Sequence, residues 1–158
     1  MKEAQRKGLF VGSFDPFTIG HDDIVRRALG LFDGLIIGVG TNPDKAYKYS
    51  EEERINAIRT HFADEPKVEV IGYSDFAIDL AKRVGAKYIV RGVRSIRDFE
   101  YERDQAVFNK RLGDIETILL YADPTLSAIS SSAVRELEHF NKDASWMIPK
   151  VDNDEQDE

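Results

Sequence analysis

A chain of 158 residues, 42% of them hydrophobic, is long enough for one domain with a substantial core and too short for two ordinary domains. The formal net charge is -7, and five of these charges belong to the acids of residues 152–158, a stretch without any base. We therefore expect one domain over residues 1–150 and a disordered acidic tail over residues 151–158, which argues against nucleic acid as a partner.

Cysteine and membrane signals are both missing from the sequence. Without cysteine the chain has no disulfides, no thiolate zinc sites and no thiol nucleophiles. No apolar run approaches the ~20 residues of a membrane span, and the charged N-terminus lacks the apolar region of a signal peptide. These features predict a cytoplasmic protein without a membrane partner.

Strand and helix patterns alternate along the chain. Five short β-branched and aliphatic runs predict buried strands at residues 9–11, 35–39, 68–71, 88–90 and 118–121. Helical spacing appears between them, in the sets Ile24, Ala28 and Leu31, then Ile55, Ile58 and Phe62, then Phe76, Leu80 and Val84. Ser50 and Glu53 form a capping-box pattern for the second helix, and Gly85 ends the third. Further helices are expected over residues 96–112 and from 131 toward 140.

This alternation predicts an α/β fold with a single doubly wound, five-stranded parallel sheet. Right-handed crossovers then place helices on both faces of the sheet. Ligands in such folds bind beyond the carboxyl ends of the strands. We therefore expect the functional residues in the loops that follow the strands.

The first of these loops has the sequence GSFDPFTIGH, residues 12–21. Gly12 and Gly20 allow close backbone approach, and helix amides that begin near His21 suit a phosphate. An ordinary strand-to-helix turn with a histidine at the helix start also explains these residues.

The standard nucleotide motifs are missing after the second strand. There is no Walker A pattern, and Pro43 stands where the third glycine of a dinucleotide fingerprint belongs. Lys45 in this loop is a candidate phosphate ligand or simply a solvated side chain. His61 and His139 fall on predicted helices without metal-ligand spacing, so we expect them at the surface and expect no histidine metal site.

The loops after the fourth and fifth strands are rich in phosphate-binding groups. Arg91 and Arg94 flank Gly92, and guanidinium forks at a strand end suit a polyphosphate. Surface ion pairs with the acids of residues 98–102 are the alternative. Residues 127–132 bring serine hydroxyls and free amides to a helix start, as a phosphate cradle or as ordinary caps.

Taken in this order, the four loops resemble those of bacterial phosphopantetheine adenylyltransferases, from Leu9 to about Pro149. The GSFDPFTIGH segment is similar to the Thr/His-x-Gly-His signature of the nucleotidyltransferase superfamily, with Ser13 for the usual threonine and Ile19 for a common asparagine. RGVRSIRDFEYE and ISSS resemble the pantetheine branch rather than the cytidylyltransferase branch. The resemblance implies a Rossmann-like nucleotidyltransferase domain over residues 1–150, a homohexamer, Mg²⁺ dependence and feedback by coenzyme A.

The resemblance also assigns site residues by position. It implies catalytic roles for His21, Lys45 and Arg91, and an acceptor site formed by Ser13, Lys45, Arg91 and the backbone near Ala77. The implied ATP-binding residues are Ser13, Phe14, His21, Gly92, Val93, Arg94, Glu102, Leu126, Ser127, Ala128, Ile129, Ser130, Ser131 and Ser132. Asp15 and Glu102 are not paired at ligand spacing, so we expect Mg²⁺ to be bound mainly through the ATP phosphates. Helical spacing favours a core position for Phe76, Val107 and Phe108 over a pocket for the pantetheine arm.

The implied reaction is reversible transfer of the adenylyl group of ATP to 4′-phosphopantetheine, which gives dephospho-coenzyme A and pyrophosphate. The acceptor phosphate is already ionised near neutral pH, so in-line attack on the α-phosphorus needs positioning and charge neutralisation but no general base. Two alternatives stay open: a sister nucleotidyltransferase with another phosphorylated acceptor, and a non-catalytic module that senses adenylates.

Overall fold

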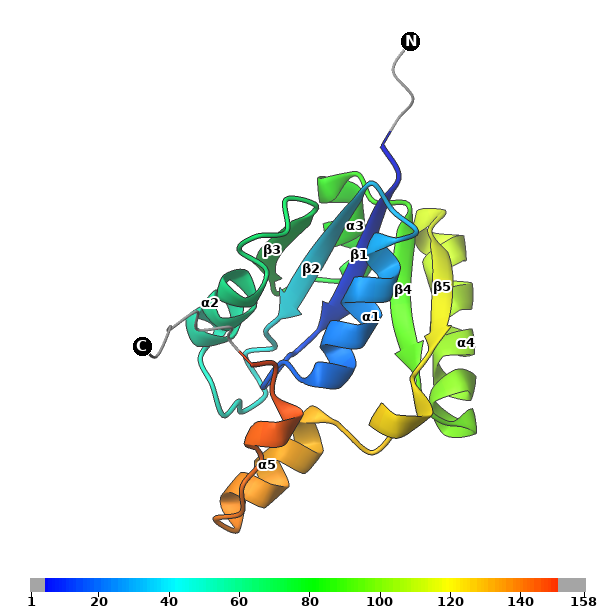
Figure 1. Cartoon of the computed structure of the whole chain (residues 1–158). Helices are drawn as coiled ribbons and strands as arrows, with labels where there is room; N and C mark the ends of the chain where they lie inside the picture. The colour runs from blue at the N-terminus through cyan, green and yellow to red at the C-terminus, as the bar shows by residue number, and fades with distance from the viewer. Residues whose placement is uncertain (1–4, 151–158) are drawn as a thin grey trace.

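The computed structural model describes residues 5–150 of the chain (Figure 1). The predicted acidic tail, residues 151–158, lies outside the described residues. Within residues 5–150, no helix combines the length and the apolar character that crossing a membrane requires.

The centre of the fold is a parallel sheet of five strands in the order β3-β2-β1-β4-β5. The strands are β1 (Lys7–Gly12), β2 (Gly34–Gly40), β3 (Val68–Tyr73), β4 (Tyr88–Val93) and β5 (Glu116–Tyr121). Every neighbouring pair is parallel, so all carboxyl ends meet at one edge. The fold prediction is confirmed, and the strand order reverses between β1 and β4, the point where such sheets bind ligands.

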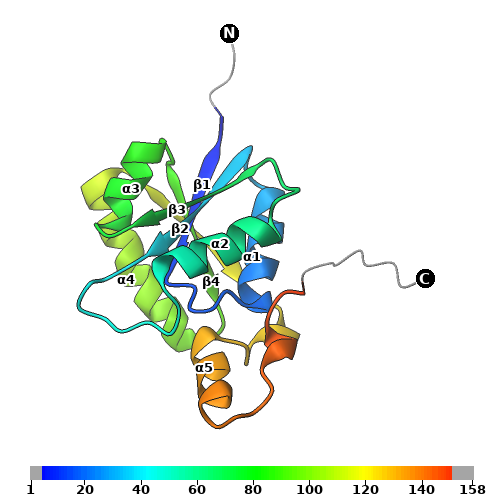
Figure 2. The same cartoon turned by 90° about the vertical axis from the view of Figure 1, so that its left-hand side faces the viewer.

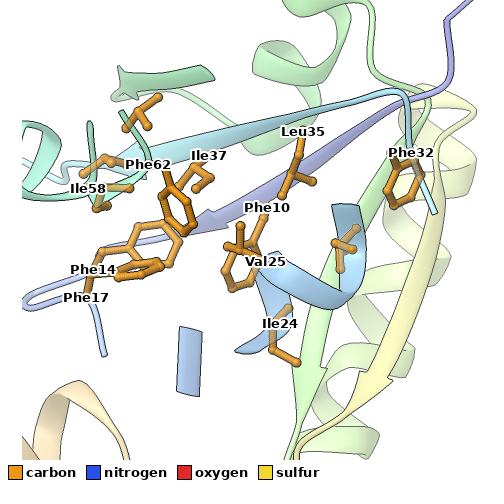
Figure 3. Close-up of a cluster of buried hydrophobic side chains, with 14 residues drawn as sticks. Phe10, Phe14, Phe17, Ile24, Val25, Phe32, Leu35, Ile37, Ile58 and Phe62 are labelled. Atoms are coloured by element: carbon orange, nitrogen blue, oxygen red, sulfur yellow. The ribbon is translucent and has the colours of Figure 1, made fainter. Parts of the chain in front are cut away.

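Helices cover both faces of this sheet (Figure 2). They are α1 (Ile19–Leu29), α2 (Glu51–His61), α3 (Ala77–Val84) and α4 (Ile96–Gly113). One face packs a cluster that includes Phe10, Ile24, Val25 and Ile58, so α1 and α2 lie on this side (Figure 3). The other face packs Leu9, Ile36 and Leu80 with Ile115, which brings α3 to the opposite side. Burial of these two apolar faces is the main driving force for the layered arrangement.

Helix α5 (Ser131–His139) lies apart from these layers, beyond the carboxyl edge of the sheet (Figure 1). The short turns η1 (Pro124–Leu126) and η2 (Ser145–Met147) flank it. A third apolar cluster of Ile129, Val134, Ala144 and Met147 anchors this segment. The cluster fixes the amino end of α5 opposite the ends of β1 and β4.

Two local expectations about caps are met in different degrees. Gly85 ends α3 with a φ of 74°, the left-handed conformation that glycine adopts without a steric cost. At the start of α2 the Ser50 hydroxyl accepts from the Glu53 amide, but the Glu53 carboxylate makes no return bond within residues 5–150. The predicted capping box is therefore only half formed.

Four side-chain placements expected from the sequence are wrong. Phe76, Val107 and Phe108 are 79%, 61% and 54% exposed instead of forming core. Val107 and Phe108 are exposed because α4 packs against the sheet through few residues, of which only Glu102 is fully buried. Phe76 is the N-cap residue of α3 and so stands outside the helical face that packs on the sheet. His61, expected at the surface, is partly buried against Phe62, and its Nε2 lies 2.7 Å from Asp22 Oδ1.

Candidate active site

Two cavities adjoin each other at the carboxyl edge of the sheet. The first has a volume of about 360 Å³ and lies between the ends of β1 and β4 and the start of α5. The second, of about 650 Å³, lies between the ends of β1, β2 and β3. Five residues line both cavities: Val11, Gly12, Ser13, Lys45 and Arg91. The shared wall therefore brings together residues from three predicted segments, those at the ends of the first, second and fourth strands.

The start of α1 fixes the orientation of His21. The Thr18 hydroxyl accepts a hydrogen bond from the His21 amide, and His21 Nδ1 accepts one from the Thr18 amide at 3.0 Å. This is a reciprocal capping box with histidine in the place of the usual glutamate or glutamine. Because an amide can only donate, Nδ1 is unprotonated, and the proton of the neutral ring resides on Nε2.

The surroundings of His21 keep the ring neutral. Burial of the ring lowers the pKa of His21 from 6.5 to about 4, with Arg94 and Arg91 as additional causes because their positive charges oppose protonation. Phe14 and Phe17 pack against the imidazole, at centroid distances of 5.0 and 5.4 Å. Phe14 itself has a φ of 49°, a conformation that costs a side-chain-bearing residue ~1–2 kcal/mol. His21 therefore presents a neutral N–H donor in the first cavity at physiological pH.

Arg91 is held in the shared wall by a buried carboxylate. Its Nε donates to Glu102 Oε1 at 2.9 Å, and its Nη2 lies 2.8 Å from the same oxygen. The Nη1 atom donates to the Val11 carbonyl at 2.8 Å. Glu102 is 5% exposed, so this pair is screened little by solvent. Glu102 thus acts on the cavity through Arg91, which remains partly exposed.

Arg94 connects the end of β4 to the segment before α5. Its Nε pairs with Asp98 Oδ2 at 3.4 Å, and its Nη1 donates to the Ile129 carbonyl at 3.3 Å. Both arginines of the RGVR segment therefore form ion pairs with acids of residues 98–102 and also line the first cavity. The segment therefore combines the two interpretations from the sequence, ion pairing with these acids and a position suited to a polyphosphate. Gly92 provides close approach to Ile24 of α1, because an added Cβ would lie 3.1 Å from its Cγ1.

The serine segment contributes mainly backbone to the first cavity. The Ser130 hydroxyl caps α5 by accepting from the Ala133 amide, and Ser131 Oγ donates to the Pro16 carbonyl at 2.7 Å. The Ser132 hydroxyl accepts from Arg135 Nη2. The helix geometry leaves the Ser131 and Ser132 amides without an intrahelical acceptor. These amides, at the positive end of the helix, are the groups suited to an anion.

Lys45 differs from the other cations of the site because it stands on an exposed loop. Its amide donates to the Asn42 carbonyl, and its Nζ lies 5.4 Å from the centre of the Tyr47 ring. With the acids of residues 5–150 it forms no ion pair. Its charge is therefore available at the wall between the two cavities.

Most residues that the sequence analysis assigned to the site line one of the two cavities. The first cavity is lined by Ser13, Phe14, His21, Lys45, Arg91, Gly92, Arg94, Glu102, Leu126, Ile129, Ser130, Ser131 and Ser132. Four assigned residues line neither cavity: Ala77, Val93, Ser127 and Ala128. Ala77 packs in the cluster under α3, and its neighbour Phe76 lines the second cavity in its place.

Sequence reasoning also missed several residues of the site. Arg135 lines the first cavity and donates to the Asp15 carbonyl at 2.7 Å. Tyr47 and Tyr73 line the second cavity. Arg135 follows the serine segment by one helical turn, and this spacing was a signal that could have found it. The tyrosines had no such signal, because their approach to the cavity depends on how the loops fold.

The described part of the chain holds no cluster of three or more histidine and carboxylate side chains suited to a metal ion. Asp98 and Glu102 are already paired with Arg94 and Arg91. The groups of the first cavity that can bind an anion are cations, amides, hydroxyls and one imidazole N–H. Such donors fit phosphate oxygens directly.

Comparison with known proteins agrees with this chemistry. A family model described as Cytidylyltransferase-like matches residues 9–137. A Bacteroides fragilis protein named phosphopantetheine adenylyltransferase is 47% identical over 145 residues, which cover 92% of this chain and 97% of the relative. A Porphyromonas gingivalis protein of the same name is 49% identical over 142 residues, which cover 90% of this chain and 93% of the relative.

A solved structure supports the fold at lower sequence identity. The bifunctional NMN adenylyltransferase/ADP ribose pyrophosphatase of Francisella tularensis, complexed with AMP and a manganese ion, superposes with a TM-score of 0.70. The identity is 16%, and the match covers 94% of this chain and 46% of the other. At this identity the likeness concerns the fold alone.

Proposed function

The chain belongs to the phosphopantetheine adenylyltransferase family, within the cytidylyltransferase-like nucleotidyltransferases, and we propose that its two adjoining cavities carry out that family's reaction. The protein is an adenylyltransferase of coenzyme A biosynthesis. ATP occupies the first cavity and 4′-phosphopantetheine the second. The adenylyl group passes between them, giving dephospho-coenzyme A and pyrophosphate.

The observation that carries this proposal is the wall shared by the cavities. Ser13, Lys45 and Arg91 line both of them, so phosphate groups bound on the two sides meet at a hydroxyl and two cations. An adenylate sensor would need only the first cavity. The second, lined by Tyr47, Tyr73 and Phe76, offers apolar and hydrogen-bonding surface for a long amide-containing arm.

In the proposed step a phosphate oxygen of the acceptor attacks the α-phosphorus of ATP. The bond from this phosphorus to the bridging oxygen of the β-phosphate breaks, and pyrophosphate leaves with the electron pair. No proton has to be removed from the ionised acceptor, so no general base is required. The protein contributes alignment and stabilisation of the negative charge that develops on the phosphoryl oxygens.

His21 donates its Nε2–H to an α-phosphate oxygen. Its neutral state suits this role, because the donor stays fixed by the Thr18 amide and does not exchange a proton with the substrate. Arg91 and Lys45 hold the acceptor phosphate from the shared wall. Arg94, Arg135 and the amides at the start of α5 bind the β- and γ-phosphates.

Mg²⁺ enters this proposal as a companion of the nucleotide. We place the ion mainly on the ATP phosphates, because Asp15 accepts the amides of Lys48 and Tyr49 and Glu102 pairs with Arg91. Bound there, it would neutralise charge on the phosphate oxygens. The protein groups described above perform their roles at positions that do not depend on a protein-bound ion.

The proposal includes a homohexamer and a feedback ligand. Helix α4 leaves Ile96, Val107 and Leu112 more than half exposed, which is unusual for large apolar side chains on one helix and supports contact with further copies of the chain. Coenzyme A or dephospho-coenzyme A, with adenylyl and pantetheine parts, would fill both cavities at once and compete with both substrates. Light scattering tests the hexamer, and inhibition kinetics with coenzyme A test the second point.

The reaction is tested by supplying ATP with a panel of phosphorylated acceptors and measuring both pyrophosphate and the adenylylated product by mass spectrometry. We expect both with 4′-phosphopantetheine and neither with nicotinamide mononucleotide or glycerol 3-phosphate. Turnover of another acceptor at a higher rate would favour a sister nucleotidyltransferase. ATP binding without any pyrophosphate release would favour the adenylate sensor.

A further inference from the structure

Two charged side chains are buried beside the site without lining either cavity. Arg54 of α2 and Asp15 of the first loop are each 3% exposed. Neither was assigned a role above. Burial of a charge is costly unless each polar atom finds a partner, so the partners of these two groups indicate what they hold together.

The partners of Arg54 come from both ends of the loop that carries Lys45. At the start of the loop its Nη1 donates to the Gly40 carbonyl at 3.0 Å, and its Nη2 donates to the Thr41 hydroxyl at 2.9 Å. At the end of the loop its Nε donates to the Tyr49 carbonyl at 3.2 Å. One guanidinium thus bridges the two ends of the loop formed by residues 40–49.

The same guanidinium also reaches the first cavity and the lysine. Its Nη1 donates to the Ser13 carbonyl at 2.8 Å, which fixes the backbone at the shared wall. Its Cζ lies 4.2 Å from the centre of the Tyr47 ring, and Lys45 Nζ lies 5.4 Å from the centre of the same ring. The Tyr47 ring therefore lies in contact with both cations, and its position depends on Arg54.

Asp15 fastens the same loop from the other side. Its two carboxylate oxygens accept hydrogen bonds from the amides of Lys48 and Tyr49, at 2.8 and 2.9 Å. A carboxylate that accepts two backbone amides is a strong, charge-assisted anchor. The exposed lysine loop is thus joined to the GSFDPF segment by two buried groups of opposite charge.

From this network we propose that Arg54, assisted by Asp15, is a positioning residue for the reaction, acting through Lys45. The inference rests on the proposed function. In this proposal the position of residues 40–49 depends on Arg54, which thereby sets the distance between the Lys45 ammonium and the wall shared by both cavities. A displacement of about 1 Å at such a group costs up to ~100-fold in rate.

The principal test is the variant Arg54→Lys, which keeps the charge but lacks the fork that reaches both loop ends. We expect kcat to fall ~10- to 100-fold while the Kd for ATP changes less than ~3-fold. Arg59→Lys is the matched control, because Arg59 lies on the same helix and, among residues 5–150, donates to the Val70 carbonyl alone, away from both cavities. It should turn over at the wild-type rate.

A double-mutant cycle distinguishes positioning from general stabilisation. If Arg54 acts through Lys45, Arg54→Lys should cost less than ~3-fold in turnover when it is introduced into Lys45→Ala. Full multiplication of the two losses would overturn the proposal, and so would wild-type kcat in Arg54→Lys. Asp15→Asn, which retains only one suitable acceptor for the two amides, should show the same dependence on Lys45 with a smaller loss.

A readout that needs neither turnover nor a mutant completes the test. Hydrogen exchange of the wild-type chain should show the amides of Lys48 and Tyr49 strongly protected and that of Ala46, exposed on the same loop, exchanging fast. Unprotected amides at 48 and 49 would contradict the anchor directly. Should the wild-type chain form no dephospho-coenzyme A, the proposed function fails while this exchange result stands, so the two failures are distinguishable.

Discussion

The two cavities are built from different kinds of structure. The first is formed by the ends of regular elements: the last residues of β1 and β4 and the first turns of α1 and α5. Its imidazole stands in the cavity wall and is bonded to backbone. The second is formed largely by loop side chains, including Tyr47 and Phe76, and the lysine at its edge is exposed.

This difference indicates how the two ligands are recognised. Helix amides and strand ends place donors with little freedom, which suits the common triphosphate of a nucleotide. Loop side chains require further support, which Arg54 and Asp15 supply here, but they determine which acceptor fits. We therefore expect substitutions in the first cavity to affect the chemical step, and substitutions at the second cavity or the shared wall to affect how the acceptor is bound and aligned for that step.

The largest effect is expected from His21→Ala, which tests whether the first cavity governs the chemical step. Removing one fixed donor to the transition state should lower kcat ~100- to 1000-fold, with much less effect on the Kd for ATP. Steady-state kinetics with calorimetric ATP titration measures the two quantities. His139→Ala, at the exposed far end of α5, is the control and should keep normal turnover. Equal losses in kcat and in ATP affinity would limit His21 to ground-state binding.

Lys45→Ala tests the acceptor side. We expect kcat/KM for 4′-phosphopantetheine to fall ~100-fold, because the cation that this loop brings to the shared wall is lost while the first cavity keeps its other groups. The Kd for ATP should stay within ~3-fold of the wild-type value. Lys87→Ala, an exposed lysine before β4 at the opposite edge, provides the comparison. Unchanged kinetics would return Lys45 to the role of a solvated side chain.

The burial of His21 also predicts a dependence of stability on pH. The folded pKa of about 4 lies below the unfolded value of 6.5, so the unfolded chain binds the proton first as the pH falls. The stabilisation is complete above pH 6.5 and is lost between pH 6.5 and 4, amounting to about 2 kcal/mol by pH 5.

His21→Gln serves as the reference, because glutamine at this position also completes a capping box but does not titrate. Urea unfolding at pH 7 and pH 5 should show a larger loss for the wild type than for this variant. An equal loss in both proteins would mean that His21 titrates normally and is not held neutral.

The same contrast between backbone and side chain explains what the sequence could predict. Strand and helix alternation, the glycine at the end of α3 and the position of His21 follow from local patterns, and the fold agrees. The protonation state of His21 does not follow, because it depends on the packing of Phe14 and Phe17 and on two arginines that are distant in sequence, one in β4 and one just after it. Periodicity finds a helical face but not what covers it, so Val107 and Phe108 were wrongly expected in the core.

The burial of Arg54 could have been predicted from the sequence. Arg54 stands four residues before Ile58 and eight before Phe62, on the buried stripe of α2. A charged residue in an apolar stripe has to find partners inside the protein. Those partners lie in loops whose paths the sequence does not specify, so the pattern could have shown that Arg54 is buried but not what it holds.

The smallest effect should come from Ser130→Ala, which separates capping from phosphate binding in the serine segment. The hydroxyl accepts from the Ala133 amide, so its removal should cost ~1 kcal/mol of stability, as for other N-caps. Turnover should fall less than ~3-fold, because the cavity keeps the Ser131 and Ser132 amides. Thermal unfolding and steady-state kinetics on one preparation measure both. A large loss of turnover without a loss of stability would instead make the Ser130 hydroxyl a direct phosphate ligand.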